Sequence, residues 1–240
     1  MGYSSKKAPV MTREQEIMAS RHFGHHVSRE KAAVLFVAAL LFCISPMLMG
    51  LRLYEQIPAI VETGLIGVDG KDDSLPRWAL VYAIPSLMCV LTIICHVQLI
   101  LNQRLLRVPS TPIRILGRWT IPVISLFFCS WAISSGAGET LSRRFYLSCV
   151  LASLLTLLGS HLYDCGKEKK LALRLRFTEA SDRAWKGTHR LVGLCWMLAG
   201  LMIPASLMLA GKMPPLSLGA ALVLIILPLP LCALIYRKKH

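Results

Sequence analysis

Acidic residues are scarce in this chain of 240 residues, which has 13 Asp and Glu against 27 Lys and Arg. Only 17% of the residues are charged, whereas a soluble domain carries about 25%. No acidic residue lies in the middle of a long apolar run, so a proton-coupled transporter would lack its usual carboxylate relay. A net charge of +14 in a soluble protein would suggest nucleic-acid binding, but basic residues also gather on the cytoplasmic flanks of membrane helices. Membrane insertion is therefore the favoured interpretation, and we expect no direct contact with nucleic acid.

Motifs of catalysis and of metal binding are also missing. The sequence has no HExxH, GxSxG, P-loop or glycine-rich dinucleotide motif. Its eight cysteines form no CxxC pair and lie in or beside apolar runs, which is typical of small apolar filling residues. We therefore expect no enzyme, no cofactor and no metal site. We also expect no cleavable signal peptide, because the first 30 residues are polar and the first apolar run is too long.

The chain is rich in long apolar runs. Hydrophobic residues make up 55% of it, and the mean hydropathy is +0.56. They fall into runs of about 20 residues, the length that crosses ~30 Å of hydrocarbon as a helix. The runs are 32–53, 78–101, 119–135, 145–163, 191–210 and 216–236. The sequence thus predicts an all-α integral membrane bundle of about six transmembrane helices.

These runs divide the chain into five segments. They are a basic cytoplasmic tail (1–31), a first helix pair with an acidic outer loop (32–101), a second helix pair (102–163), a cytoplasmic loop (164–190), and a third helix pair with a basic C-terminus (191–240). The two tails and the loops 102–118 and 164–190 hold 21 of the 27 Lys and Arg. Basic residues remain on the cytoplasmic side of a bilayer, so both termini are predicted to lie inside the cell.

Two features of the runs allow more than one interpretation. Aromatic residues near the run ends are typical of interfacial anchors: Trp78, Trp119, Tyr146, Tyr163 and Tyr236. Prolines inside the runs are expected to kink the helices: Pro46, Pro85, Pro122, Pro204, Pro228 and Pro230. Broken helices can line a transporter site, but proline is also more common in membrane helices than in soluble ones, and this second explanation is favoured.

Ionisable residues near the inner ends of the runs are candidates for a polar cluster. His96 lies near the end of the second run, and His161 and Asp164 lie three residues apart at the end of the fourth, on one helix face. His189 precedes the fifth run. The cluster can receive the 164–190 loop or form a proton- or metal-linked site, or each His can simply be neutral near the headgroups. The N-terminal His22, His25 and His26 can bind a metal, but a solvated basic tail, with a short helix on the membrane surface, is the favoured interpretation.

The loop 164–190 is the longest polar stretch between two apolar runs. Thr178 is a suitable N-cap for a helix that continues through Trp185 and His189 into the fifth run. On that helix Asp182, Trp185 and His189 share a face, and Trp185 is expected at headgroup level. Gly187 is expected to loosen the join to the span. The preceding Arg174 and Arg176 can meet lipid phosphates or an acidic partner, although a plain interfacial connecting helix explains the same pattern.

The spacing of six residues in this loop resembles the hallmark of the SdpI family of small bacterial membrane proteins. That hallmark reads roughly G-I-R-T-P-W-T, then a short polar helix, then W-x-x-T-H-x-x-x-G. The matching residues here are Arg174, Thr178, Trp185, Thr188, His189 and Gly193. The first half departs from the pattern, because Ala172, Leu175, Arg176 and Phe177 stand where Gly, Thr, Pro and Trp are usual.

A second, weaker similarity lies in the first outer loop. Family members often carry P-x-H-x-x-x-x-G-x-x-D-G there, followed by a span with an early proline. The similar residues here are Pro58, Gly64 or Gly67, Asp69, Gly70 and Pro85. Ile60 replaces the His of the motif, so no role of that His is carried over.

The resemblance implies a non-enzymatic protein of the bacterial plasma membrane. The namesake of the family gives immunity to a secreted killing-factor toxin and signals by holding a small winged-helix autorepressor at the membrane. An acidic outer loop suits a cationic peptide, and a basic inner loop suits a cytoplasmic partner. Two alternatives stay open. One is a small transporter, and the other is a membrane enzyme that holds lipid phosphate with Arg174, Arg176, Arg183 and His189.

The orientation is testable with a reporter fused after Tyr236. We expect alkaline phosphatase, which is active only outside the cytoplasm, to be inactive there, and a cytoplasmic fluorescent protein to be bright. The same two reporters inserted between Gly70 and Lys71 should give the opposite result. An active phosphatase at the C-terminus contradicts the predicted topology.

Overall fold

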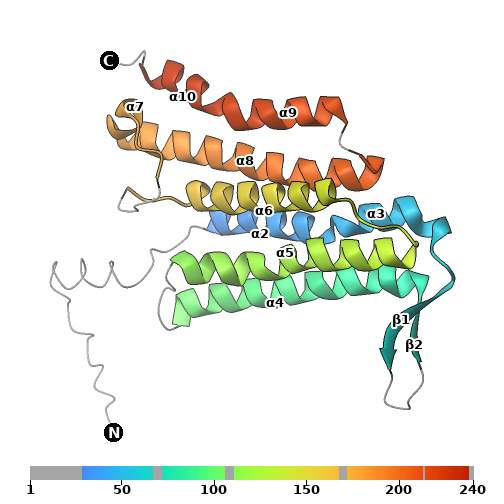
Figure 1. The fold of residues 1–240 in the computed structure, drawn as a ribbon. Helices are drawn as coiled ribbons and strands as arrows, with labels where there is room; N and C mark the ends of the chain where they lie inside the picture. Colours follow the sequence, from blue (N-terminus) through green and yellow to red (C-terminus); the bar gives the residue numbers. More distant parts are fainter. Residues whose placement is uncertain (1–28, 67–71, 106–110, 168–171, 213, 238–240) are drawn as a thin grey trace, which may run out of the picture.

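The computed structural model describes residues 29–66, 72–105, 111–167, 172–212 and 214–237 (Figure 1). The N-terminal tail with His22, His25 and His26, and the outer-loop residues Gly67, Asp69 and Gly70, lie outside this range. The interpretations given to them above therefore stay predictions.

Six helical segments are long and apolar enough to cross a membrane within the described residues. Three are single helices: α5 (Thr111–Gly136), α6 (Arg143–Tyr163) and α8 (Asp182–Ala210). The others are composite: α2 with α3 (Arg29–Ile44 and Pro46–Leu53), η2 with α4 (Ala79–Ala83 and Ile84–Leu105), and α9 with α10 (Pro215–Ile226 and Pro228–Arg237). The expected helical bundle is confirmed in this respect, and the protein is a multi-pass membrane protein.

The loop between the first two spans differs from the all-α expectation, because part of it is a β-hairpin. Strands β1 (Ile60–Ile66) and β2 (Asp72–Pro76) pair in antiparallel fashion, with Ile60 opposite Pro76 and Glu62 opposite Ser74. A short 3-10 turn, η1 (Tyr54–Gln56), leads into it. β-Branched residues begin the first strand, and Pro76 lies at the edge, where no further strand needs its missing N–H.

Two spans begin earlier than the apolar runs suggest. Helix α5 begins at Thr111, and α8 begins at Asp182. Ser181 caps α8 by accepting a hydrogen bond from the Ala184 N–H at 3.1 Å. The prediction that Thr178 is the cap is therefore wrong: Thr178 lies within a separate short helix, α7 (Arg176–Glu179).

Proline has different effects in different spans. Pro46 and Pro228 each begin the second part of a divided span, whereas Pro122 and Pro204 lie inside continuous helices. Pro85 follows the π-helical turn η2. Two of the prolines expected to kink a helix thus coincide with a divided span, whereas at Pro122 and Pro204 the helix is continuous, because neighbouring helices can satisfy a freed carbonyl.

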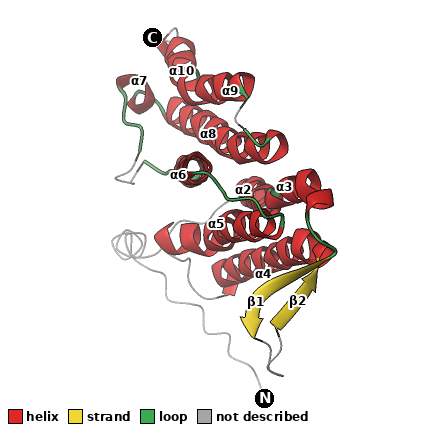
Figure 2. Ribbon diagram, turned by 45° about the vertical axis from the view of Figure 1, so that its right-hand side comes forward, coloured by secondary structure: helices red, strands yellow, loops and turns green. Residues whose placement is uncertain are grey.

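The spans lie side by side in one layered order. Figures 1 and 2 show α9 and α10 at one edge, then α8, then α6 and α2, then α5, with α4 at the other edge. The described chain begins and ends at the same end of this bundle, where α4 and α6 also end and α5 and α8 begin. We call this the basic end, and the opposite one, which carries β1 and β2, the hairpin end.

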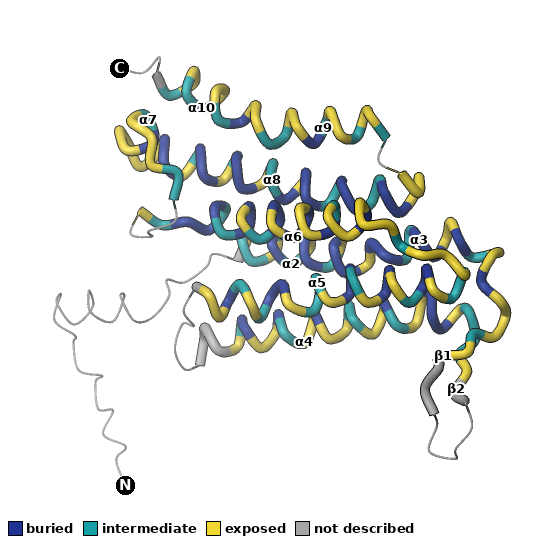
Figure 3. Tube along the Cα trace, in the orientation of Figure 1, coloured by how far each residue is buried: buried dark blue, intermediate teal, exposed yellow. Residues whose placement is uncertain are grey.

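Burial falls from the middle of the bundle to its edges (Figure 3). Half of the most apolar stretch of α6 and of α8 is buried, against 22% in α4 and 17% in α9 with α10. Exposed leucine, isoleucine and valine cover the edge helices, as expected where lipid replaces water. Trp119 is 1% exposed and meets Phe42 edge-on at 6.1 Å, so the prediction that it is an interfacial anchor is wrong.

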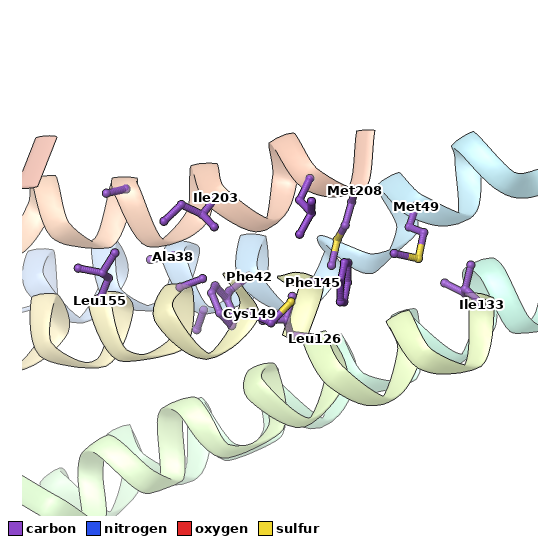
Figure 4. Close-up of a cluster of buried hydrophobic side chains, with 14 of the residues drawn as sticks. Ala38, Phe42, Met49, Leu126, Ile133, Phe145, Cys149, Leu155, Ile203 and Met208 are labelled. Atoms are coloured by element: carbon purple, nitrogen blue, oxygen red, sulfur yellow. The ribbon is translucent and has the colours of Figure 1, made fainter. Parts of the chain in front are cut away.

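The core joins the two halves of the chain. Phe42 of α2, Leu126 of α5 and Phe145 of α6 lie close to Ile203 and Met208 of α8 in Figure 4. At the hairpin end, Arg52 donates from Nε to the Met208 carbonyl at 3.1 Å. That carbonyl is near the end of α8, where helix carbonyls lack partners of their own.

The backbones of α6 and α8 approach each other closely. A Cβ on Gly159 would meet the Gly193 oxygen at 2.7 Å and the Met197 nitrogen at 2.8 Å. A Cβ on Gly193 would meet the Gly159 oxygen at 2.6 Å, and one on Gly200 would meet the Ala152 oxygen at 2.8 Å. Only glycine permits such an approach, which is how small residues drive helix association in lipid.

Replacing Gly159 by alanine should therefore separate the two helices. We expect Gly159→Ala to lower the free energy of unfolding by about 1–3 kcal/mol, the usual effect of overpacking, although alanine favours a helix more than glycine does. The measurement is unfolding of the purified protein in mixed micelles.

The matched control is Gly219→Ala in α9, where nothing lies within 4 Å of the added carbon. Its stability should stay equal to that of the wild type or rise slightly. Equal stabilities of the two variants would contradict the close approach of α6 and α8.

Candidate functional site

The candidate site is the segment between α6 and α8 together with the first turns of α8, at the basic end. Helix α6 ends at Tyr163, and the chain then passes α7 before α8 begins at Asp182. The six residues with the family spacing all lie here, five of them in α7 or α8. Five of the six residues are buried, and only Arg174 is exposed.

His189 joins the segment to α8. Its Nε2 accepts a hydrogen bond from the Leu173 N–H at 3.1 Å, so this nitrogen carries no proton. The other ring nitrogen, Nδ1, therefore carries the proton and donates to the Trp185 carbonyl at 2.9 Å. His189 is 1% exposed and is a neutral imidazole in this arrangement. It is bonded as a structural residue within the fold.

Trp185 makes the second connection. Its indole stacks on His189, with the ring centroids 4.1 Å apart, and its Nε1 donates to the Cys165 carbonyl at 3.3 Å. The side chain is only 4% exposed. The prediction of a headgroup-level anchor is wrong, because the indole N–H finds its partner inside the protein and not at the bilayer surface.

Thr178 makes the third connection. Its Oγ1 accepts a hydrogen bond from the Leu175 N–H at 2.9 Å. The hydroxyl proton is shared between two carbonyl oxygens, that of Leu173 at 2.9 Å and that of Leu175 at 2.8 Å. The residue is fully buried. At the surface, Lys167 pairs with Asp182, which is exposed, so Asp182 does not share the inward face of Trp185 and His189.

The remaining residues of the pattern serve packing. Thr188 is fully buried, and its side chain lies beside the buried Cys232 thiol of α10. Gly193 lies in the close contact with α6. Gly187 permits the approach of the Tyr236 hydroxyl from α10, and α8 runs unbroken past it, so the expected loosening of the helix there is wrong.

Basic side chains cover the outside of the same segment. We call four exposed residues on α7, α8 and the chain before them the basic surface: Arg174, Arg176, Arg183 and Lys186. The Arg174 guanidinium also donates to the Lys167 carbonyl at 3.5 Å. The arrangement therefore presents positive charge outward from a segment whose neutral polar groups are bonded inward.

The predicted polar cluster of His96, His161 and Asp164 does not form a single group, because each of the three side chains has different neighbours. Asp164 is 8% exposed and pairs with Lys31 at 3.4 Å and with Arg114 at 3.5 Å. His96 is buried on α4, stacked on Phe36 with the centroids 4.2 Å apart. His161 is half-buried and lies on the side of α6 that faces His189.

Sequence reasoning missed the basic members of this cluster. Lys31 begins the first span, and Arg114 and Arg118 begin the third, four residues apart and so on one helix face. Arg118 is 8% exposed and lies close enough to Asp164 and Arg114 to interact with their charges. The spacing of Arg114 and Arg118 was the sequence feature that could have indicated the cluster. Basic residues are common beside membrane spans, so this pair did not stand out.

No group of three or more His, Cys, Asp or Glu side chains suited to a metal ion occurs among the residues that the structure describes. The eight cysteines are free thiols.

Removing the Thr178 hydroxyl should release the segment without unfolding the bundle. Thr178→Val leaves the Leu175 N–H without its acceptor, and a lost hydrogen bond of about 1 kcal/mol corresponds to about fivefold faster amide exchange. Hydrogen-exchange mass spectrometry on residues 172–179 measures this. Thr120→Val is the control, since that exposed hydroxyl bonds only to Leu116 in its own helix. Unchanged exchange in Thr178→Val would contradict the role assigned to the hydroxyl.

Comparison with known proteins adds no assignment to this geometry. No family model, no curated protein and no solved structure matches the chain.

Proposed function

We propose that this chain is an SdpI-like protein of the bacterial plasma membrane that acts by binding. In this proposal it gives immunity to a peptide toxin outside the cell, signals through a cytoplasmic partner such as a small winged-helix repressor, or does both. It has no enzymatic step. The support is the six-residue spacing of the loop together with six spans, which the family also has.

The proposed orientation places the basic end in the cytoplasm. Both described ends of the chain lie there, and so do the loops that carry most of the Lys and Arg. The acidic loop with β1 and β2 then faces outward. Glu55 and Glu62 are exposed in that region, which suits a cationic peptide.

One observation supports a binding role above all others. The polar residues of the loop are bonded inward, while Arg174, Arg176, Arg183 and Lys186 stay outside on the same short segment. Since the backbone beneath them is held by His189, Trp185 and Thr178, the charges have a fixed spacing. A fixed positive surface binds an acidic partner with less loss of conformational entropy than a free loop would.

The proposed alternative with lipid-phosphate chemistry at this loop receives less support. It requires His189 beside Arg174, Arg176 and Arg183 as one phosphate-holding group. His189 is 1% exposed and uses both ring nitrogens inside the protein, whereas the arginines are exposed. A phosphate held by the arginines would not reach the imidazole.

Charge reversal of the basic surface should abolish capture of the partner. We expect the double variant Arg174→Glu, Arg176→Glu to leave a fluorescent copy of the proposed winged-helix repressor in the cytoplasm and not at the membrane. Two reversed contacts at about 1–3 kcal/mol each weaken binding at least tenfold. Fluorescence microscopy at equal membrane levels of each variant measures this.

The matched control is Arg143→Glu, Arg144→Glu, an exposed arginine pair at the hairpin end. It should leave recruitment of the repressor unchanged. If both double variants recruit the repressor like the wild type, the basic surface does not bind it. Survival of cells exposed to the toxin tests immunity separately, because a protein that gives only immunity would keep survival in the Arg174 and Arg176 variant.

A further inference from the structure

Helix α4 forms one edge of the bundle and turns a long face away from the other spans (Figures 1 and 3). Its inner side is fixed by Thr92, whose hydroxyl donates to the Cys43 sulfur of α2 at 3.6 Å. His96 is on the same inner side and stacks on Phe36. The opposite side carries a row of exposed residues at alternating steps of four and three, which we call the α4 row: Leu87, Leu91, Ile94, Gln98 and Leu101.

The spacing of the α4 row is that of the seam in a left-handed pair of helices, where steps of four and three repeat every seven residues. Most pairs of membrane helices adopt this geometry. Other faces of the bundle share part of the pattern. Helix α6 exposes leucines at the same steps, and the exposed residues of the span Pro215–Tyr236 are apolar, Gly or Pro. Lipid is a sufficient covering for those two faces.

Gln98 distinguishes the α4 row from both of them. Its side chain is exposed in the last turn of the apolar stretch, which ends at Leu101. Within the described residues this carboxamide makes no hydrogen bond. A carboxamide offers two N–H donors and an acceptor oxygen, for which lipid tails provide no partner. Glutamine is one of the side chains that form hydrogen bonds between helices in membranes, so its position indicates a further helix against α4.

A second copy of this chain supplies the matching group. All copies insert into the bilayer with the same orientation, so two copies are related by a two-fold axis along the membrane normal, and their α4 helices are parallel. On that axis each residue of the row meets its own counterpart. Two carboxamides are complementary, because each donates an N–H to the oxygen of the other. Gln98 is thus self-complementary, which favours a second copy over an unrelated partner.

We propose that the protein forms a symmetric dimer in the membrane through the α4 row. Gln98 of one copy pairs with Gln98 of the other near the basic end, and Leu87, Leu91 and Ile94 pack against their counterparts. A single polar residue in an otherwise apolar seam fixes the register of the two helices. The dimer does not depend on the proposed function, because the α4 row shares no residue with the basic surface and lies at the far edge of the bundle from α8 (Figure 2).

Dilution of the full-length protein in liposomes measures this association. Donor and acceptor fluorescent proteins are fused after His240, and energy transfer is followed as the ratio of lipid to protein rises. We expect Gln98→Leu, which keeps the row apolar, to associate about fivefold to tenfold more weakly than the wild type, as for two lost hydrogen bonds between membrane helices. Gln98→Asn keeps a carboxamide and should retain most of the association.

The control variant is Thr120→Val, which removes an exposed hydroxyl from α5 that bonds only within its own helix. It should associate as the wild type does. Equal association of the wild type and Gln98→Leu overturns the proposal, because the amide pair then contributes nothing. Energy transfer of the wild type at the level expected for random proximity overturns it as well.

Photo-crosslinking in cells identifies what covers the row. Benzoylphenylalanine is introduced at Ile94 on α4 or at Leu222 on α9, which are 50% and 49% exposed. We expect a product of twice the chain mass from position 94 that contains two differently tagged copies, and no such product from position 222. A product with another protein overturns the second copy as the occupant. Attachment to lipid alone at both positions overturns the dimer.

Discussion

The backbone contact between α6 and α8 is the constraint on which the rest of the basic end depends. Lipid tails are as apolar as leucine, so the two helices gain nothing from excluding water and must gain from close packing. Gly159, Gly193 and Gly200 permit that packing. Once it forms, the end of α6 lies beside the start of α8, and the chain between them has to turn back within a small volume.

That turn explains why polar residues occur so densely in an otherwise apolar chain. A segment folded against helices at the membrane edge cannot leave its N–H and C=O groups without partners. His189 accepts from Leu173, Trp185 donates to Cys165, and the Thr178 hydroxyl bonds the backbone beside it. The pattern that first looked like a recognition motif is therefore, in this structure, a set of internal bonds that fixes where the basic surface lies.

The sequence predicted what depends on length and local pattern. The six spans follow from apolar runs, and the continuation of α8 through Trp185 and His189 follows from cap chemistry, although Ser181 and not Thr178 is the cap. The hairpin was missed because its strands are short and interrupted by glycine and acidic residues. The inward direction of Trp119 and Trp185 was missed because a tryptophan near the end of a run looks the same whether it faces lipid or a neighbouring helix.

The cluster of Lys31, Arg114, Arg118 and Asp164 was beyond sequence reasoning for a stronger reason. Its members come from three helices, and nothing in the local pattern says which helices are neighbours. Counting basic residues to assign a cytoplasmic side treats all of them alike, yet the structure separates two kinds. Arg174 and Arg176 are exposed and interact through water, where salt screens charges beyond about 8–10 Å.

Arg114 and Arg118 are buried, and buried charges are screened much less. A charge that meets the exposed residues competes with water and salt, whereas the charge of Asp164 acts on the buried pair in surroundings of lower dielectric constant. The same end of the bundle thus holds two positive surfaces that differ in dielectric surroundings.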